Sequence, residues 1–233
     1  MADESTALIL GASRGLGLAL VEEFLGRGHR VIGTVRSPSP ALDKAGAAHP
    51  GRLEVETVDI TDTNGLRTLR QRLEERSIDV VIVNAGIALS IEKSPAQVDD
   101  QDFVAMMLTN ALAPVRAIEV LEDLVPADGV LAVMSSELGS IEMATGFWQL
   151  YSASKAALNM LMKSFVSRRA KVPGGDSRAV LLLAPGWVRT DMGGAGALYG
   201  IEESIPKVVD VVEASRGVPG LRFVDRFGEI LPW

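Results

Sequence analysis

The stretch Thr6-Ala-Leu-Ile-Leu-Gly-Ala-Ser-Arg-Gly-Leu-Gly17 decides the fold. It opens with a short apolar run, Thr6 to Leu10, that suits a buried parallel strand. Three glycines follow, and after Gly17 the apolar residues return at helical spacing. A strand, a glycine-rich turn and a helix in this order are typical of the first unit of a dinucleotide-binding fold.

Each glycine of this turn has a different expected role. Gly11 permits the tight turn out of the strand, Gly15 lets the backbone approach a pyrophosphate, and Gly17 lets the helix pack closely on the sheet. The start of the helix then directs free N–H groups and a positive dipole end at the phosphates. The spacing is Gly-x-x-x-Gly-x-Gly rather than Gly-x-Gly-x-x-Gly. Its place between a strand and a helix favours cofactor binding over a simple turn.

Strands alternate with helical stretches along the rest of the chain. Further strands are predicted at residues 29–35, 53–58, 78–83, 130–134, 179–184 and 221–224. After a short helical segment that follows Pro40, longer helices are predicted at residues 65–76, 102–124, 150–172 and 201–214. This alternation predicts a doubly wound, Rossmann-type three-layer α/β sandwich with a seven-stranded parallel sheet. The length, without repeats or linkers, predicts a single domain over residues 1–233.

The composition excludes several classes of function. The formal net charge of −7 argues against nucleic acid or an anionic membrane surface as a partner. The chain has no cysteine, and its two histidines, His29 and His49, lie outside the motifs, so no metal site is expected. The start has no basic segment or apolar signal core, and no apolar run approaches the ~18 residues of a membrane span. We therefore expect a cytoplasmic protein.

A tyrosine and a lysine stand four residues apart in Tyr151-Ser-Ala-Ser-Lys155. On a helix this spacing puts both side chains on one face, one turn apart. A phenol normally has a pKa near ~10, and a neighbouring ammonium is expected to lower it. Such a tyrosine could exchange a proton with a carbonyl oxygen near neutral pH. Taken alone, the pair also fits an ordinary surface tyrosine and lysine.

The helix predicted at residues 102–124 contains two residues that are costly inside a helix. They are Asn110 and Pro114, and the proline also removes a backbone donor. We therefore expect a kink near Asn110, with or without a catalytic part.

Together these features resemble the classical type of the short-chain dehydrogenase/reductase family. The motifs occur in the family's order: the glycine turn, Asn84-Ala-Gly86, Ser135-Ser-Glu-Leu-Gly139, Tyr151-x-x-x-Lys155 and Pro185-Gly186. The resemblance covers essentially the whole chain. The closing stretch Gly228-Glu-Ile-Leu-Pro-Trp233, with a long interval between Ser136 and Tyr151, resembles the C-factor and sniffer-like carbonyl reductase branch.

The resemblance implies four catalytic residues. Tyr151 would protonate the substrate carbonyl oxygen, and Ser136 would orient that oxygen. Lys155 would bind the nicotinamide ribose and lower the pKa of Tyr151, while Asn110 would hold a water in a proton relay. The interval from the serine to the tyrosine is longer than the common family pattern. An alternative alignment would therefore put Ser135 or Ser140 in the place of Ser136.

The resemblance also implies a nicotinamide cofactor along the strand ends. Val188 and Thr190 would bracket the nicotinamide, and Asp59 would contact the adenine or only form a turn. Arg36 ends the second strand, where an acidic residue would select NAD, and Arg14 matches a basic residue of NADP-dependent members. We therefore expect NADP(H). The expected cofactor-binding residues are Gly11, Ser13, Arg14, Gly15, Leu16, Gly17, Arg36, Asp59, Ile60, Asn84, Ala85, Gly86, Tyr151, Lys155, Pro185, Gly186, Val188 and Thr190.

The predicted function is reversible hydride transfer between NADP(H) and a ketone or aldehyde, in a homodimer or homotetramer. The small-molecule substrate is expected to be apolar or aromatic, from the residues near the motifs: Met143, Phe147, Trp148, Trp187, Met192 and Tyr199. One alternative is a cofactor-binding signalling protein of the C-factor type with little turnover, which would often lose the tyrosine or the lysine. Another is a sugar-nucleotide epimerase, which would carry Gly-x-x-Gly-x-x-Gly and a larger C-terminal domain.

Overall fold

The computed structural model describes residues 5–172 and 177–233, and its centre is a seven-stranded parallel sheet. The acidic start at residues 1–4, where no signal segment is predicted, lies outside the described residues. The strand order is β3-β2-β1-β4-β5-β6-β7. The strands are β1 (Thr6–Leu10), β2 (Arg30–Val35), β3 (Leu53–Thr57), β4 (Val80–Val83), β5 (Val130–Met134), β6 (Ala179–Ala184) and β7 (Gly220–Asp225). The order reverses between β1 and β4, and doubly wound sheets bind ligands at such a reversal.

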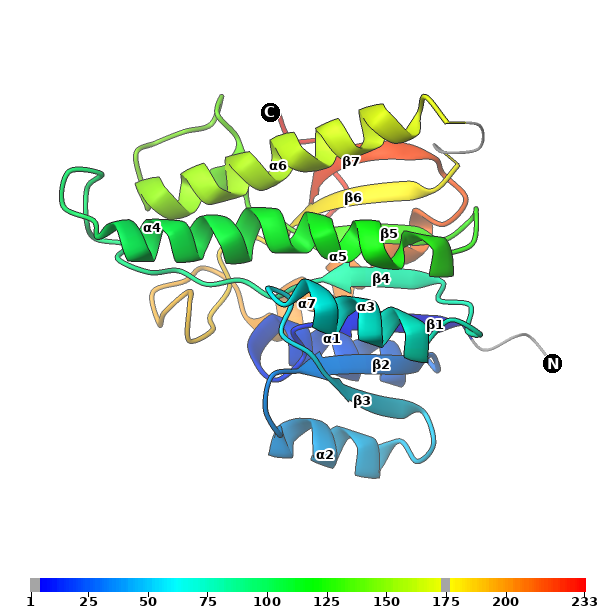
Figure 1. The fold of residues 1–233 in the computed structure, drawn as a ribbon. Coiled ribbons are helices and arrows are strands. Elements are labelled where there is room, and N and C mark those ends of the chain that lie inside the picture. Colours follow the sequence, from blue (N-terminus) through cyan, green and yellow to red (C-terminus); the bar gives the residue numbers. More distant parts are fainter. Residues whose placement is uncertain (1–4, 173–176) are drawn as a thin grey trace.

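Helices cover both faces of the sheet (Figure 1). In the described residues they are α1 (Gly15–Gly26), α2 (Pro40–Ala48), α3 (Thr63–Arg72), α4 (Asp100–Met107), α5 (Ala113–Leu121), α6 (Gln149–Arg169) and α7 (Ile201–Ala214). One face carries α3, α5 and α6, and the other carries α1, α2 and α7. The predicted three-layer, doubly wound fold is therefore confirmed.

The inner strands feed two separate apolar cores because side chains alternate between the faces of a sheet. In β1, Leu8 and Leu10 enter the core under α3, α5 and α6, while Ala7 and Ile9 enter the core under α1, α2 and α7. All four side chains are fully buried. Burial on both faces explains why the central strands are continuous apolar runs rather than alternating ones.

The glycine turn after β1 is sterically tight. Gly11 has a φ of +88°, and a Cβ there would lie 2.7 Å from the Cβ of Ala85. A Cβ at Gly17 would lie 2.0 Å from the carbonyl oxygen of Gly11. These distances confirm that Gly11 forms the turn out of the strand and that Gly17 lets α1 pack against it.

The helix predicted at residues 102–124 is not one α-helix. Between α4 and α5 the chain forms a π-helical segment, Leu108–Leu112, and after α5 it ends in a 3₁₀ turn, Glu122–Leu124. The N–H of Ala113 donates to the carbonyl of Leu108, five residues earlier. Pro114 has no N–H and cannot bond to the Asn110 carbonyl as an α-helix requires. The expected kink is therefore a widened helical turn centred on Asn110.

The same stretch, Asp100–Leu124, is long and apolar enough to cross a membrane, by length and composition. The sequence-based expectation that no segment approaches this limit is wrong on that measure. Half of the apolar window is nevertheless buried inside the fold. The stretch is a core helix of the layer that covers the sheet.

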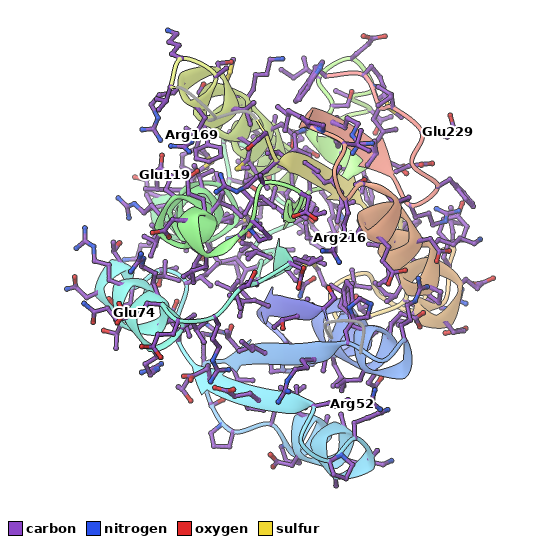
Figure 2. All side chains as sticks on the ribbon, turned by 90° about the vertical axis from the view of Figure 1, so that its right-hand side faces the viewer. Arg52, Glu74, Glu119, Arg169, Arg216 and Glu229 are labelled. Carbon is purple, nitrogen blue, oxygen red and sulfur yellow. The ribbon has the colours of Figure 1, made fainter. Side chains whose placement is uncertain are left out.

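Two helix ends differ from the sequence-based bounds. Asp62 caps α3, which begins at Thr63 instead of residue 65, and its carboxylate accepts the N–H of Asn64 at 2.9 Å. The helix then ends at Arg72 instead of residue 76, and α6 ends at Arg169 instead of residue 172. Figure 2 shows Glu119 and Arg169 at the neighbouring ends of α5 and α6, where Arg169 pairs with Glu122 at 3.0 Å.

Candidate active site

A cleft with a volume of about 560 Å³ runs along the carboxyl ends of the strands. Its volume falls within the usual range for ligand sites, ~300–1,000 Å³. Every predicted catalytic and cofactor-binding residue lines it except Gly17 and Asn110. Of the residues expected around the substrate, Met143 and Tyr199 do not line it. The fold therefore brings together residues that are as far apart in the sequence as Gly11 and Thr190.

The glycine turn is fixed by two side chains from neighbouring strands. The N–H of Gly11 donates to the hydroxyl of Thr34 at 3.1 Å, and the amide of Asn84 donates to the carbonyl of Gly11 at 2.8 Å. Asn84 therefore steadies the turn. Thr34 was not predicted, although a hydroxyl side chain within the apolar run of β2 is the sequence signal that could have found it.

The start of α1 is suited to an anion. The helix begins at Gly15 without a side-chain cap and without an acidic residue in its first turn. Its first N–H groups and its dipole therefore favour a negatively charged ligand. Gly15 has a φ of +56°, and the nearest atom to a Cβ there would be 3.8 Å away, on Thr190. This cradle fits the phosphates of a dinucleotide.

Basic and acidic side chains surround the end of the cleft beside β2 and β3. Arg36 is exposed at the end of β2, and Arg14 pairs with Asp191 at 2.6 Å on the surface. The carboxylate of Asp59 accepts hydrogen bonds from the N–H and the hydroxyl of Thr61, at 2.8 and 2.7 Å. Burial raises the pKa of Asp59, but these bonds and the charge of Arg36 lower it overall. Asp59 thus forms the turn and also lines the cleft.

The catalytic candidates meet where β5 ends beside α6. Tyr151 and Lys155 lie one turn apart on α6, and the tyrosine hydroxyl is hydrogen-bonded to Ser136. The Nζ of Lys155 donates to the carbonyl of Met134 at 2.8 Å and lies 5.6 Å from the centre of the Tyr151 ring. Lys155 is only 3% exposed. The site therefore combines the phenol of Tyr151, the hydroxyl of Ser136 and the amine of Lys155.

The two alternative serines have other partners. The hydroxyl of Ser135 donates to the side-chain oxygen of Asn159 at 2.7 Å. The hydroxyl of Ser140 accepts the N–H of Met143 at 3.1 Å. Both serines are buried, whereas Ser136 is bonded to Tyr151. The geometry therefore favours Ser136.

The side chain of Asn110 is fully engaged and buried. It accepts the N–H of Ile87 at 2.8 Å and donates to the Ile87 carbonyl at 2.7 Å and to Ser154 at 3.0 Å. A Cβ at Gly86 would lie 3.4 Å from the Asn110 side-chain oxygen and 3.7 Å from the Nζ of Lys155. Asn110 therefore lies near Lys155, and its main-chain carbonyl lacks the donor that the residue at position 114 would supply in an α-helix.

Burial sets the pKa values of the pair. It raises the pKa of Tyr151 to about 12, which the hydrogen bond with Ser136 only partly offsets. It also lowers the pKa of Lys155 to about 8. The expected lowering of the Tyr151 pKa by Lys155 is therefore wrong for this structure, because loss of solvation dominates. At neutral pH the phenol holds its proton, as a proton donor must.

Aromatic side chains form a wall beside the reactive hydroxyls. Phe147 stacks on Trp148 at 5.2 Å between ring centres, and Trp148 meets Tyr151 edge-on at 5.6 Å. Trp187 approaches Phe147 at 6.0 Å, and its indole N–H donates to the carbonyl of Gly193 at 2.9 Å. We call Phe147, Trp148 and Trp187 the aromatic wall. Its position fits an apolar or aromatic ligand.

The family model for short chain dehydrogenases matches residues 5–196. The chain belongs to this family. The solved structure of a short-chain dehydrogenase/reductase from Burkholderia multivorans with bound NADP is 46% identical, covers 99% of this chain and 100% of its own, and superposes with a TM-score of 0.94.

Two further relatives bear on the branch of this short-chain dehydrogenase. A carbonyl reductase from Pseudomonas aeruginosa PAO1 in complex with NADP is 40% identical, with a TM-score of 0.90 over 99% of this chain and 100% of its own. The C-signal protein of Myxococcus xanthus is 34% identical over 67% of this chain and 93% of its own length. The expected likeness to the C-factor and carbonyl reductase branch is confirmed.

Proposed function

We propose that this short-chain dehydrogenase is an NADPH-preferring carbonyl reductase. The observation that carries the proposal is that Tyr151, Ser136 and the buried Lys155 line one cleft, with Tyr151 and Lys155 one turn apart on α6. These groups share one cleft with the uncapped start of α1. The NADP-bound structures and the carbonyl reductases among the relatives support the cofactor and the reaction class.

The cleft offers separate places for the parts of the cofactor. The start of α1 would hold the pyrophosphate, Arg36 and Arg14 the 2′-phosphate, and Val188 with Thr190 the nicotinamide. When bound, the nicotinamide supplies the hydride. The chain's own residues would orient the substrate and supply the proton to its carbonyl oxygen.

Ser136 and Tyr151 would both donate hydrogen bonds to the substrate carbonyl oxygen. As negative charge develops on that oxygen, Tyr151 transfers its phenolic proton to it. With a pKa of about 8, Lys155 is still protonated at pH 7 and stabilises the phenolate that remains. Water at the main-chain carbonyl of Asn110 would then return a proton toward Lys155 and Tyr151, because the widened helical turn leaves that carbonyl without the Pro114 donor.

A panel of ketones and aldehydes tests the proposal. We expect NADPH oxidation with apolar and aromatic ketones, followed as loss of absorbance by the reduced nicotinamide. The same panel is run with a Lys155→Met variant, which removes the ammonium and should abolish turnover. Tight NADPH binding without turnover of any member would contradict the reductase and favour the second candidate.

The second candidate is a cofactor-binding signalling protein with little turnover. The likeness to the C-signal protein supports it. The buried Lys155 and the Tyr151–Ser136 hydrogen bond argue for the reductase, because binding of a dinucleotide alone needs neither a proton donor nor its neighbour.

The helix pair α4 and α6 gives a reason to expect a dimer. Several apolar side chains on this face are exposed, with Val104 at 60% and Met160 at 66%. Burial of such a patch against a second copy would stabilise a two-fold pair, the commonest symmetric assembly. We expect a dimeric or tetrameric mass by light scattering at micromolar concentration.

A variant pair sharpens this prediction. Val104→Arg combined with Met160→Glu should shift the mass toward the monomer, because it puts charge on the patch. Ile230→Glu, on an apolar residue that is 67% exposed and belongs to neither helix, should leave the mass unchanged. A monomeric wild-type protein would refute the assembly.

The acidic chain without cysteine is consistent with a location in the cytoplasm. The same sheet carries both the glycine turn and the Tyr151–Lys155 pair, which supports a single functional domain.

A further inference from the structure

Glu137 is a charged residue of the cleft that the proposed chemistry does not use. It follows Ser136 directly and begins the 3₁₀ turn Glu137–Gly139 after β5. It lines the same cleft as Ser136 and Tyr151. Within residues 5–172 and 177–233, its carboxylate has neither a hydrogen bond nor an ion pair. This carboxylate is therefore available to a ligand.

The other charged side chains that line the cleft form an ion pair or a hydrogen bond, or are assigned to cofactor binding. Arg14 pairs with Asp191, Asp59 accepts from Thr61, and Lys155 donates to the Met134 carbonyl. Arg36 stands near Asp59, far along the chain and the sheet from the reactive hydroxyls. The end of the cleft that holds Ser136 and Tyr151 thus contains the ammonium of Lys155, which is buried and hydrogen-bonded to a carbonyl, and the carboxylate of Glu137, which is more exposed and has no partner among the described residues.

The aromatic wall lines this same end of the cleft. Phe147 and Trp187 remain 46% and 41% exposed, so their rings are accessible to a ligand. Ring faces attract cations, tryptophan most strongly, and aromatic cages are the usual recognition element for quaternary ammonium groups. A carboxylate in the same cleft as such rings adds a charge attraction for a cation and repels an anion.

We propose that the preferred substrate is an aromatic ketone that carries an ammonium group, and that Glu137 with the aromatic wall selects it. Ketones that bear a carboxylate or phosphate are disfavoured by the same charge. The inference rests on the proposed reductase function, since it names the substrate class of that site. Glu137 adjoins the serine that would orient the carbonyl oxygen, so the ammonium belongs on the same small molecule as the carbonyl.

Three acetophenones of similar shape test the proposal. Each carries a para-methylene group that ends in trimethylammonium, in neutral tert-butyl or in carboxylate. The kcat/KM of each is measured with NADPH at low ionic strength, where exposed charges are least screened. We expect the cation to exceed the neutral ketone about tenfold and the anion to fall about tenfold below it, which corresponds to ~1.4 kcal/mol each way.

Two matched variants assign the effect to Glu137. Glu137→Gln should reduce the cation-to-anion ratio at least tenfold, and this comparison cancels any intrinsic difference in ketone reactivity. Glu142→Gln removes the same charge from an exposed residue of the next loop that does not line the cleft, and it should leave the ratio unchanged. A wild-type ratio near one, or a ratio that Glu137→Gln does not move, would overturn the proposal.

Equilibrium binding separates this inference from the reductase proposal. The same ketones are titrated by calorimetry into protein loaded with NADP⁺, which cannot reduce them. Preferential binding of the cation, lost in Glu137→Gln, supports the selection by Glu137 even if no ketone is turned over. If the neutral ketone is reduced but neither measurement shows a preference for the cation over the anion, the reductase proposal holds and the role of Glu137 is refuted.

Discussion

Tyr151→Phe is expected to lower kcat for ketone reduction by about 10²–10⁴-fold, the usual contribution of a general acid. The substitution removes only the hydroxyl that is hydrogen-bonded to Ser136 and keeps the ring that meets Trp148 edge-on. The Kd for NADPH, measured by fluorescence of the reduced nicotinamide, should change little. A loss confined to kcat would identify the hydroxyl as a group that acts in the transition state.

The chain provides a matched control, because it has one other tyrosine, Tyr199. Its ring lies 3.7 Å from the guanidinium of Arg226 and does not line the cleft. Tyr199→Phe removes the same hydroxyl from a place away from the carbonyl, and turnover should stay within about twofold. Near-normal turnover in Tyr151→Phe would refute the proposed mechanism.

Arg36→Asp is expected to remove a preference for NADPH over NADH of roughly a hundredfold. Hydrogen bonds to charged groups contribute ~1.5–3 kcal/mol each, and the exposed site of Arg36 and Arg14 places these bonds at the low end. The new carboxylate would repel a 2′-phosphate and accept a hydrogen bond from a 2′-hydroxyl. The measurement is kcat/KM for each cofactor in the wild type and the variant.

Two controls sharpen this experiment. Arg67→Asp makes the same charge change on an exposed residue of α3 that does not line the cleft, and it should keep the preference. Added salt should weaken the wild-type preference, since the pairing is at the surface. Equal efficiencies with both cofactors in the wild type would contradict the assignment of Arg36.

The fold was predictable because its determinants are local. The apolar run of β1, the glycines and the returning helical pattern lie within one short stretch, and the glycine contacts follow from that geometry. The distortion at Asn110 was also predictable, since Pro114 lacks the donor that an α-helix needs. Its form as a π-helical segment was not, because that depends on how the helix packs against α6.

The residues of the site could be predicted from the sequence, whereas their pKa shifts could be predicted less well. The four-residue spacing places Tyr151 and Lys155 together, but it does not reveal how far loss of solvation outweighs the charge of Lys155, which reverses the expected pKa shift of the tyrosine. Thr34 and Glu137 were also missed. Thr34 bonds a glycine turn that lies elsewhere in the sequence, and the proposed role of Glu137 depends on a cleft that it shares with the aromatic wall.

The burial of Lys155 also affects the stability of the folded protein. Its pKa of about 8 in the folded protein is below its ordinary value of 10.5, so the unfolded chain holds this proton more strongly. The free energy of unfolding therefore rises as the pH increases from about 8 to 10.5, and at neutral pH the full destabilisation is present. Laboratory evolution for thermal tolerance alone would accordingly favour apolar residues at this position. Screens for a more thermostable enzyme therefore need to select for turnover in every round.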